Sequence, residues 1–235
     1  MTDRRPELEP LLPREPRSYD PGPEVVDAML AELMGMTLRR EPTWRERLAE
    51  RSTQQRGLIV GAGLAVVSAM WLGMMGWRGD LMGVDLARYV GLSLVLVASA
   101  GFAVEGALRA VGRRALTPGL VAVGLALPVL LAALPGAWPG MRPPEGIPFD
   151  AHLMCGAMGT MLGLAYCVPM LLVQRGRPDA TRLALVGGAA GAAAFVVQNL
   201  VCGAGETTHL VFAHGFVGAA IAAALVLGER VSRRA

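Results

Sequence analysis

Cysteine and histidine side chains that could bind a metal ion or form a redox pair gather around the last three long apolar stretches of the chain. They stand at the start of one stretch, at the end of the next and in the residues that follow. Thiolates and imidazoles are ligands that zinc and copper prefer, and two thiols that approach each other also suit a redox switch. The candidate metal ligands are Cys155, Cys202, His209 and His214, with His152 as a further candidate, and the candidate redox pair is Cys155 and Cys202.

The spacing of these residues leaves two interpretations open. The chain has neither a C-x-x-C motif nor two histidines four residues apart, and His209 and His214 are five apart, which does not match one face of an α-helix. The side chains therefore either converge in the folded protein or cap separate helix ends at the membrane surface. Cys167 lies in mid-stretch beside Pro169, and we expect it to be an inert buried thiol.

An acidic residue also lies within an apolar stretch. Glu105 stands four residues before Arg109. This spacing puts both side chains on one side of a helix, where the opposite charge lowers the cost of burial. We predict a local ion pair with a structural role rather than a proton or substrate site.

The elements that must position these groups are six apolar stretches, each long enough for a membrane helix. A bilayer core of about 30 Å needs about 20 helical residues at about 1.5 Å per residue. The sequence therefore predicts an all-α membrane protein, a bundle of six transmembrane helices with a short cytoplasmic N-terminal helical arm. The stretches run from Gly57 to Trp77, Tyr89 to Val111, Leu116 to Trp138, His152 to Gln174, Leu183 to Cys202 and Thr208 to Gly228.

The distribution of arginine predicts how the chain crosses the membrane. The net charge is +3, but the basic residues follow alternate apolar stretches, so they indicate membrane topology rather than direct binding to nucleic acid. By the positive-inside rule both termini are cytoplasmic, and we predict a multi-pass protein of the bacterial inner membrane in contact with lipid. The clusters after the second, fourth and sixth stretches are Arg113 and Arg114, then Arg175, Arg177 and Arg182, then Arg230, Arg233 and Arg234.

The N-terminal part divides into a leader and an arm. Residues 1–22 are rich in proline and charge, a composition typical of a disordered segment. Residues 23–56 are predicted to form the arm, with one helix beginning at Pro23 and a second at Thr43, where Glu46 completes a capping box. Residues 57–235 form the transmembrane domain and a cytoplasmic C-terminal tail. Apolar residues recur at helical spacing in the first arm helix: Val26, Met29, Leu30, Leu33 and Met34.

This organisation resembles the NrsF-type membrane anti-sigma factors, and the CarR-type anti-sigma factors are similar. The resemblance is carried by the short arm, the six stretches, Cys155 at the start of the fourth stretch, and the run 198–202 followed by His209 and His214. The chain departs from the family pattern after the second cysteine, where Gly203 replaces the usual proline.

The resemblance implies a function for each part. The arm would bind an extracytoplasmic-function sigma factor through the apolar residues of its first helix and keep it from RNA polymerase. An envelope, metal or oxidative signal would release it. Cys155 and Cys202 would be the sensor pair, and no cofactor is implied other than a possible metal ion at the Cys/His residues.

Two other classes of protein remain as alternatives to this regulator. A small transporter or channel would need polar residues near the bilayer midplane, and Glu105 lies close to one edge. A haem- or quinone-binding subunit would use His152, His209 or His214. An enzyme is not expected, because the chain has no phosphate-binding loop, nucleophile elbow or paired carboxylates.

Overall fold

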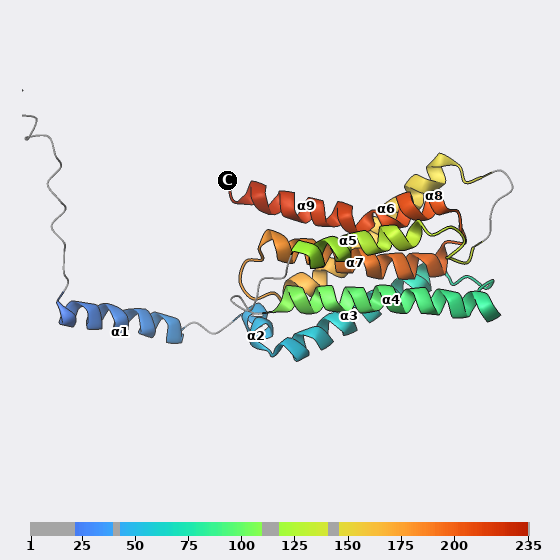
Figure 1. Ribbon diagram of the computed structural model, residues 1–235. Coiled ribbons are helices and arrows are strands. Elements are labelled where there is room, and N and C mark those ends of the chain that lie inside the picture. Colours follow the sequence, from blue (N-terminus) through green and yellow to red (C-terminus); the bar gives the residue numbers. More distant parts are fainter. Residues whose placement is uncertain (1–21, 40–42, 110–117, 141–145, 235) are drawn as a thin grey trace, which may run out of the picture. The chain divides into compact units, whose positions relative to one another are not determined.

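The computed structural model describes residues 22–39, 43–109, 118–140 and 146–234. Every regular element in these ranges is a helix, which confirms the all-α fold (Figure 1). The chain divides into two compact units, Met1–Pro42 and Thr43–Ala235. The helices are α1 (Pro23–Arg39), α2 (Trp44–Glu50), α3 (Thr53–Met75), α4 (Gly83–Leu108), α5 (Pro118–Ala132), α6 (Phe149–Leu172), α7 (Ala180–Val201), α8 (Thr207–His209), the π-helix η2 (Leu210–Gly215) and α9 (Val217–Ser232).

In the first unit, the described residues form α1, which begins at Pro23 as predicted. Its apolar side chains are exposed within this unit: Val26 keeps 39% of its surface, Met29 57% and Leu30 49%. Leu33 and Met34 are also exposed. The predicted disordered leader, apart from Gly22, lies outside the described residues.

Residues 43–56, which the sequence analysis assigns to the arm, lie in the same compact unit as the membrane helices. The division into arm and transmembrane domain stays a prediction. The predicted capping box of Thr43 and Glu46 begins α2, and a second one, from Ser52 and Gln55, begins α3. Arg175 holds α2 in place, because its guanidinium donates to the carbonyls of Ala49 (2.5 Å), Glu50 (3.0 Å) and Arg51 (3.2 Å).

Five helical segments among the described residues are long and apolar enough to span a membrane. They are α3, α4, α6, α7 and the continuous segment Thr207–Ser232, which joins α8, η2 and α9. Each matches a predicted stretch, and together they make the chain a multi-pass membrane protein by length and composition.

The third predicted stretch differs from the other five. Within the described residues, helix α5 has 15 residues, which at about 1.5 Å per residue is shorter than a bilayer core. Its predicted continuation to Trp138 is wrong, because the chain turns after Ala132 through Pro135 and Gly136, whose φ is 68°. Trp138 is buried where the chain turns, against Phe195, and its indole donates to the Leu131 carbonyl at 3.0 Å. Six crossings therefore stay a prediction.

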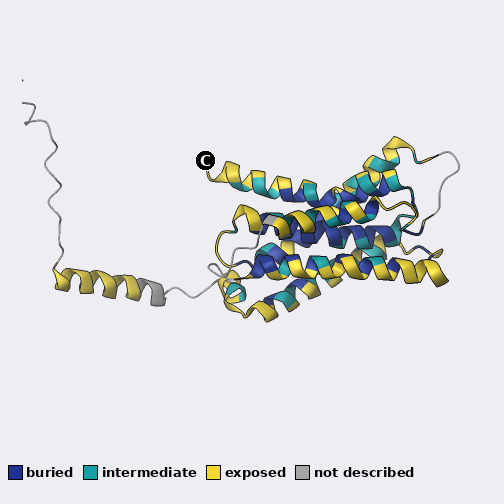
Figure 2. Ribbon diagram, viewed as in Figure 1, coloured by how far each residue is buried: buried dark blue, intermediate teal, exposed yellow. Residues whose placement is uncertain are grey.

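Helix α7 is the central element of the membrane unit, with buried residues along most of its length (Figure 2). Small residues let α9 approach it closely. A Cβ on Gly191 would lie 2.1 Å from the Cα of Gly218, and one on Gly187 would lie 2.5 Å from the Cα of Ala222. Helix α3, by contrast, has only Arg56 and Val60 buried.

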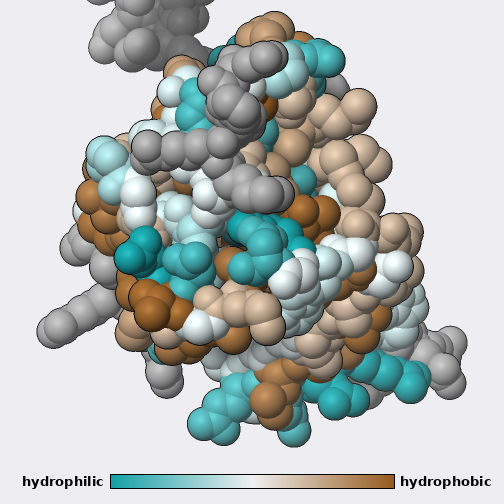
Figure 3. Space-filling model, turned by 90° about the vertical axis from the view of Figure 1, so that its right-hand side faces the viewer, coloured by the Kyte–Doolittle hydropathy of each residue, from teal (hydrophilic) through white to brown (hydrophobic). Residues whose placement is uncertain are grey.

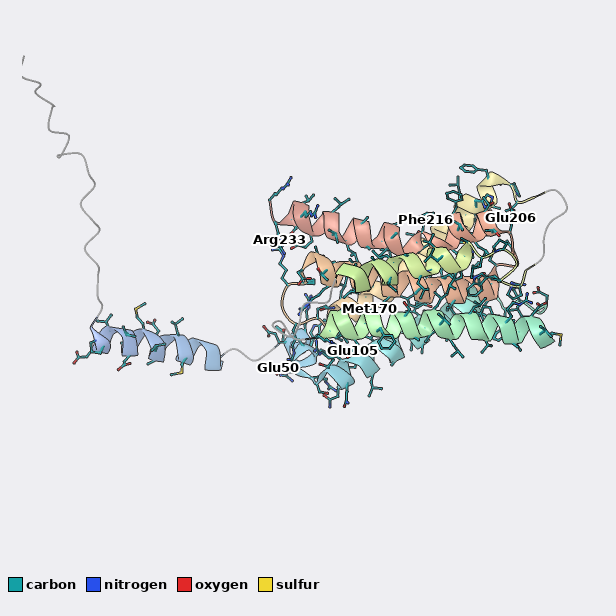
Figure 4. All side chains as sticks on the ribbon, viewed as in Figure 1. Glu50, Glu105, Met170, Glu206, Phe216 and Arg233 are labelled. Carbon is teal, nitrogen blue, oxygen red and sulfur yellow. The ribbon has the colours of Figure 1, made fainter. Side chains whose placement is uncertain are left out.

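The membrane unit has two chemically different ends (Figure 4). At one end, near the labelled Glu50, Glu105 and Arg233, three arginines donate to backbone carbonyls. We call this the basic end, defined by Arg56, Arg175 and Arg182. The opposite end, near the labelled Glu206, carries the cysteines and histidines considered below.

Candidate metal centre

Four potential ligands come together from three separate parts of the chain. Cys155 lies in the second turn of α6, Cys202 ends α7 as its C-cap, His209 closes α8 and His214 lies in η2. Their ligand atoms all lie within 4.8 Å of one another. We call this group the Cys/His site and its end of the membrane unit the Cys/His end. The four residues predicted as ligands therefore converge, which answers the question that their spacing left open.

Cys202 contacts both Cys155 and His209. The Sγ atoms of Cys155 and Cys202 are 3.8 Å apart, and the Cys202 Sγ lies 3.4 Å from Nε2 of His209. The hydrogen bond with Cys155, and after it the bond with His209, hold the pKa of the Cys202 thiol well below its usual range. Such a thiol readily forms the thiolate that binds metal ions.

The π-helix explains how His209 and His214 reach one site. A π-helix closes hydrogen bonds over five residues instead of four, as in the bond from the Phe216 amide to the Val211 carbonyl (3.2 Å). Residues five apart then lie on the same side, and the rings of His209 and His214 have centroids 5.2 Å apart. The five-residue spacing, which fits an α-helix poorly, was the one sequence signal for this geometry.

His152 is near the site but outside the set of four. Its Nδ1 lies 2.9 Å from Nδ1 of His209, the ring nitrogen that does not face Cys202. The prediction of His152 as a further ligand is therefore not supported by this geometry, in which His152 contacts a ligand rather than the centre of the site.

The two histidines of the site are buried and the two cysteines are half-buried, and some buried polar atoms at or near the site have no hydrogen-bond partner. His209 and His214 each keep only 1% of their surface. Neither ring nitrogen of His214 has a hydrogen-bond partner, and the same holds for Oε1 of Gln198 and Oε2 of Glu206. Buried polar atoms are nearly always paired, so His214 in particular needs an acceptor, a water molecule or a metal ion. Figure 3 shows hydrophilic residues gathered on this end of the unit.

Two of the distances within the Cys/His site match the edges of a tetrahedral zinc centre. With Zn–S bonds of about 2.3 Å and Zn–N bonds of about 2.0–2.1 Å, a tetrahedron has S···S edges of about 3.8 Å and S···N edges of about 3.6 Å. The observed edges are 3.8 Å for Cys155–Cys202 and 3.4 Å for Cys202–His209. Two thiolates and two imidazoles form a set that suits zinc or another thiophilic metal. The same sulfur contact would let the two thiols form a disulfide after a short approach.

Arg78 supports the site from the loop that follows α3, a role that the sequence did not indicate. Its guanidinium is buried and donates to the carbonyls of Cys202 (3.2 Å) and Pro139 (3.1 Å), while its backbone amide donates to the Leu200 carbonyl (3.0 Å). Asp80 pairs with it at 2.5 Å, and this hydrogen bond lowers the pKa of the Asp80 carboxyl. The end of α7 that carries Cys202 is thereby fixed.

The other residues singled out by the sequence lie away from the site. Glu105 and Arg109 form the predicted ion pair at 2.8 Å, half-exposed near the basic end. Cys167 is a buried thiol in α6, as expected. Neither is part of the Cys/His site.

Comparison with known proteins assigns no family to the chain. No protein-family model, no curated protein and no solved structure matches it.

Proposed function

We propose that the protein is a membrane-bound anti-sigma factor. In this proposal the arm holds an extracytoplasmic-function sigma factor, and a metal or oxidative signal at the Cys/His site releases it. The protein acts as a regulator and not as an enzyme, and it does not contact nucleic acid directly.

The observation that carries the proposal is the apolar face of α1. This helix belongs to a unit separate from the membrane helices, and Val26, Met29 and Leu30 are exposed. A single amphipathic helix gains most of its stability by covering its apolar face with another surface. A groove on a partner protein would cover it, as in other helix-in-groove complexes.

The proposed topology places the signal and the partner on opposite sides of the membrane. The basic end would face the cytoplasm by the positive-inside rule, with both termini on that side and six crossings if α5 also spans the bilayer. The Cys/His end would then face the periplasm of a bacterial inner-membrane protein. Metal ions and oxidants outside the cytoplasm would reach the site without crossing the bilayer.

The metal part of the proposal rests on the convergence of four ligand atoms within 4.8 Å of one another and on the unpartnered nitrogens of His214. Binding of a metal ion would supply one of these nitrogens with a partner and join α6, the end of α7 and η2. We expect the full-length protein, purified in detergent, to contain about one zinc or similar thiophilic ion per chain by elemental analysis.

The partner proposal is tested on the arm. We expect Leu30→Asp to release a co-purifying sigma factor, because a buried carboxylate in the contact would weaken binding by several kcal/mol, or more than about 100-fold. The protein should remain in the membrane fraction. Ala28→Asp is the matched control, since it adds the same charge to the opposite face of α1 and should leave the complex intact.

The decisive measurement is mass spectrometry of what co-purifies from native membranes. A stoichiometric sigma factor with wild type and Ala28→Asp, lost with Leu30→Asp, supports the proposal. Intact wild-type protein could instead be recovered without a sigma factor, under conditions in which the genes that the sigma factor controls are not expressed. This result would contradict the proposal and favour a transporter.

A further inference from the structure

We propose that His152 is a positioning residue of the Cys/His site, which holds the ring of His209 so that its Nε2 faces the metal ion. This inference deepens the metal-binding part of the proposed function and rests on it. In this inference His152 acts on the metal ion through His209 and is not itself a ligand.

The two ring nitrogens of His209 contact different residues. Its Nε2 faces Cys202 at 3.4 Å, and its Nδ1 meets His152 at 2.9 Å. The two rings are also in contact, with centroids 4.9 Å apart and an interplanar angle of 36°. One contact at each ring nitrogen fixes the orientation of the His209 ring. With only one of these contacts, the orientation of the ring would not be fixed.

Ligation chemistry gives the His152–His209 bond its direction. When Nε2 of a neutral imidazole binds a metal ion, the ring proton must be on Nδ1. In His209 that proton would be donated to Nδ1 of His152, which accepts it as a neutral imidazole. Metal-binding histidines commonly donate their second N–H to a fixed acceptor, and loss of the acceptor typically weakens metal binding about 10–100-fold.

The position of His152 in α6 suits this task. It stands three residues before Cys155, and residues three apart lie on the same side of a helix. One helix therefore supplies both a ligand and the support for another ligand. His152 is half-buried and also lines a groove of about 370 Å³ with Phe149 and Phe216, so it lies between the buried His209 and the surface of the unit.

The test compares zinc affinity among variants of the full-length protein in detergent, measured by competition with a chelator. His152→Phe keeps an aromatic ring but removes the hydrogen bond, and we expect zinc binding about 10–100-fold weaker than wild type. His152→Asn carries a polar atom at the position of Nδ1, and we expect it to restore most of the affinity. Leu153→Phe changes the exposed neighbour and serves as the matched control, with unchanged affinity expected.

Cobalt substitution distinguishes a support from a ligand. We expect the ligand-field bands of bound Co²⁺ to keep the intensity of a four-coordinate site with two thiolates in His152→Phe, whereas Cys155→Ser should lose intensity in the thiolate charge-transfer band. Unchanged zinc affinity in His152→Phe would overturn the inference about His152 but leave the metal site standing. A change in the cobalt coordination that His152→Asn does not restore would identify His152 as a ligand and also overturn it. Wild-type protein that binds neither ion would instead overturn the metal site itself.

Discussion

At the basic end of the membrane unit, buried arginines lie against the carbonyls that end neighbouring helices. Arg56 keeps 1% of its surface and donates to the carbonyls of Val173 (3.2 Å) and Leu108 (2.7 Å), and Arg182 donates to that of Arg109 (2.7 Å). At the Cys/His end, the ligand atoms of four side chains converge within 4.8 Å of one another instead. Unpartnered buried polar atoms occur at both ends, on His214 and on Gln174.

This difference shows how to distinguish a structural polar group from a binding group. Helix ends expose carbonyls that need donors, and an arginine that supplies these donors completes the fold. The thiols and imidazoles of the Cys/His end bond to one another, and their sulfur and nitrogen lone pairs converge where a metal ion could bind. Changes at the basic end should therefore alter stability, and changes at the Cys/His end should alter metal binding.

The largest expected effect is on metal binding. Four ligands together contribute about 10–16 kcal/mol in structural zinc sites, so the loss of one thiolate should cost about 3 kcal/mol, or more than about 100-fold in affinity. We expect Cys202→Ser to show this loss in chelator competition. Cys167→Ala removes the buried thiol outside the site and should leave the affinity unchanged. Equal zinc affinity in wild type and Cys202→Ser would contradict the expectation that changes at the Cys/His end alter metal binding.

An effect of similar size, but on stability, is expected at the basic end. Arg56→Met leaves the carbonyls of Val173 and Leu108 without their donor, and buried unsatisfied groups cost about 1–3 kcal/mol each. We expect the free energy of unfolding in detergent to fall by about 2–4 kcal/mol, with little change in zinc affinity. Arg177→Met, which removes an exposed partner of Glu229, is the control with a small expected effect. A large loss of zinc affinity in Arg56→Met would show that the two ends are coupled.

The smallest effect is expected for the exposed ion pair. Glu105 and Arg109 are about half-exposed, at 52% and 48% of their side-chain surface, and such pairs contribute at most about 0.5 kcal/mol. Glu105→Gln should therefore change the free energy of unfolding by less than about 0.5 kcal/mol. A loss above 1.4 kcal/mol, which is about tenfold in the unfolding equilibrium, would indicate that this pair is structural in the same sense as Arg56.

Features that depend on neighbouring residues could be predicted from the sequence. The capping box of Thr43 and Glu46 and the ion pair of Glu105 and Arg109 each join residues within one helical turn. The long apolar stretches likewise form helices, because backbone groups in a bilayer must be satisfied within the segment itself. The end of α5 could also have been found, since Pro135 and Gly136 mark it.

The sequence by itself determined the membrane class, the helices and the residue types available to a metal site. Only the tertiary structure decided that Cys155 meets Cys202 across 47 residues and His152 meets His209 across 57. It also decided the register of η2, which brings His214 to the site, and the burial of Arg56 and Arg78 against distant carbonyls. Such contacts depend on how the helices pack, and packing is set by many weak interactions that no local pattern contains.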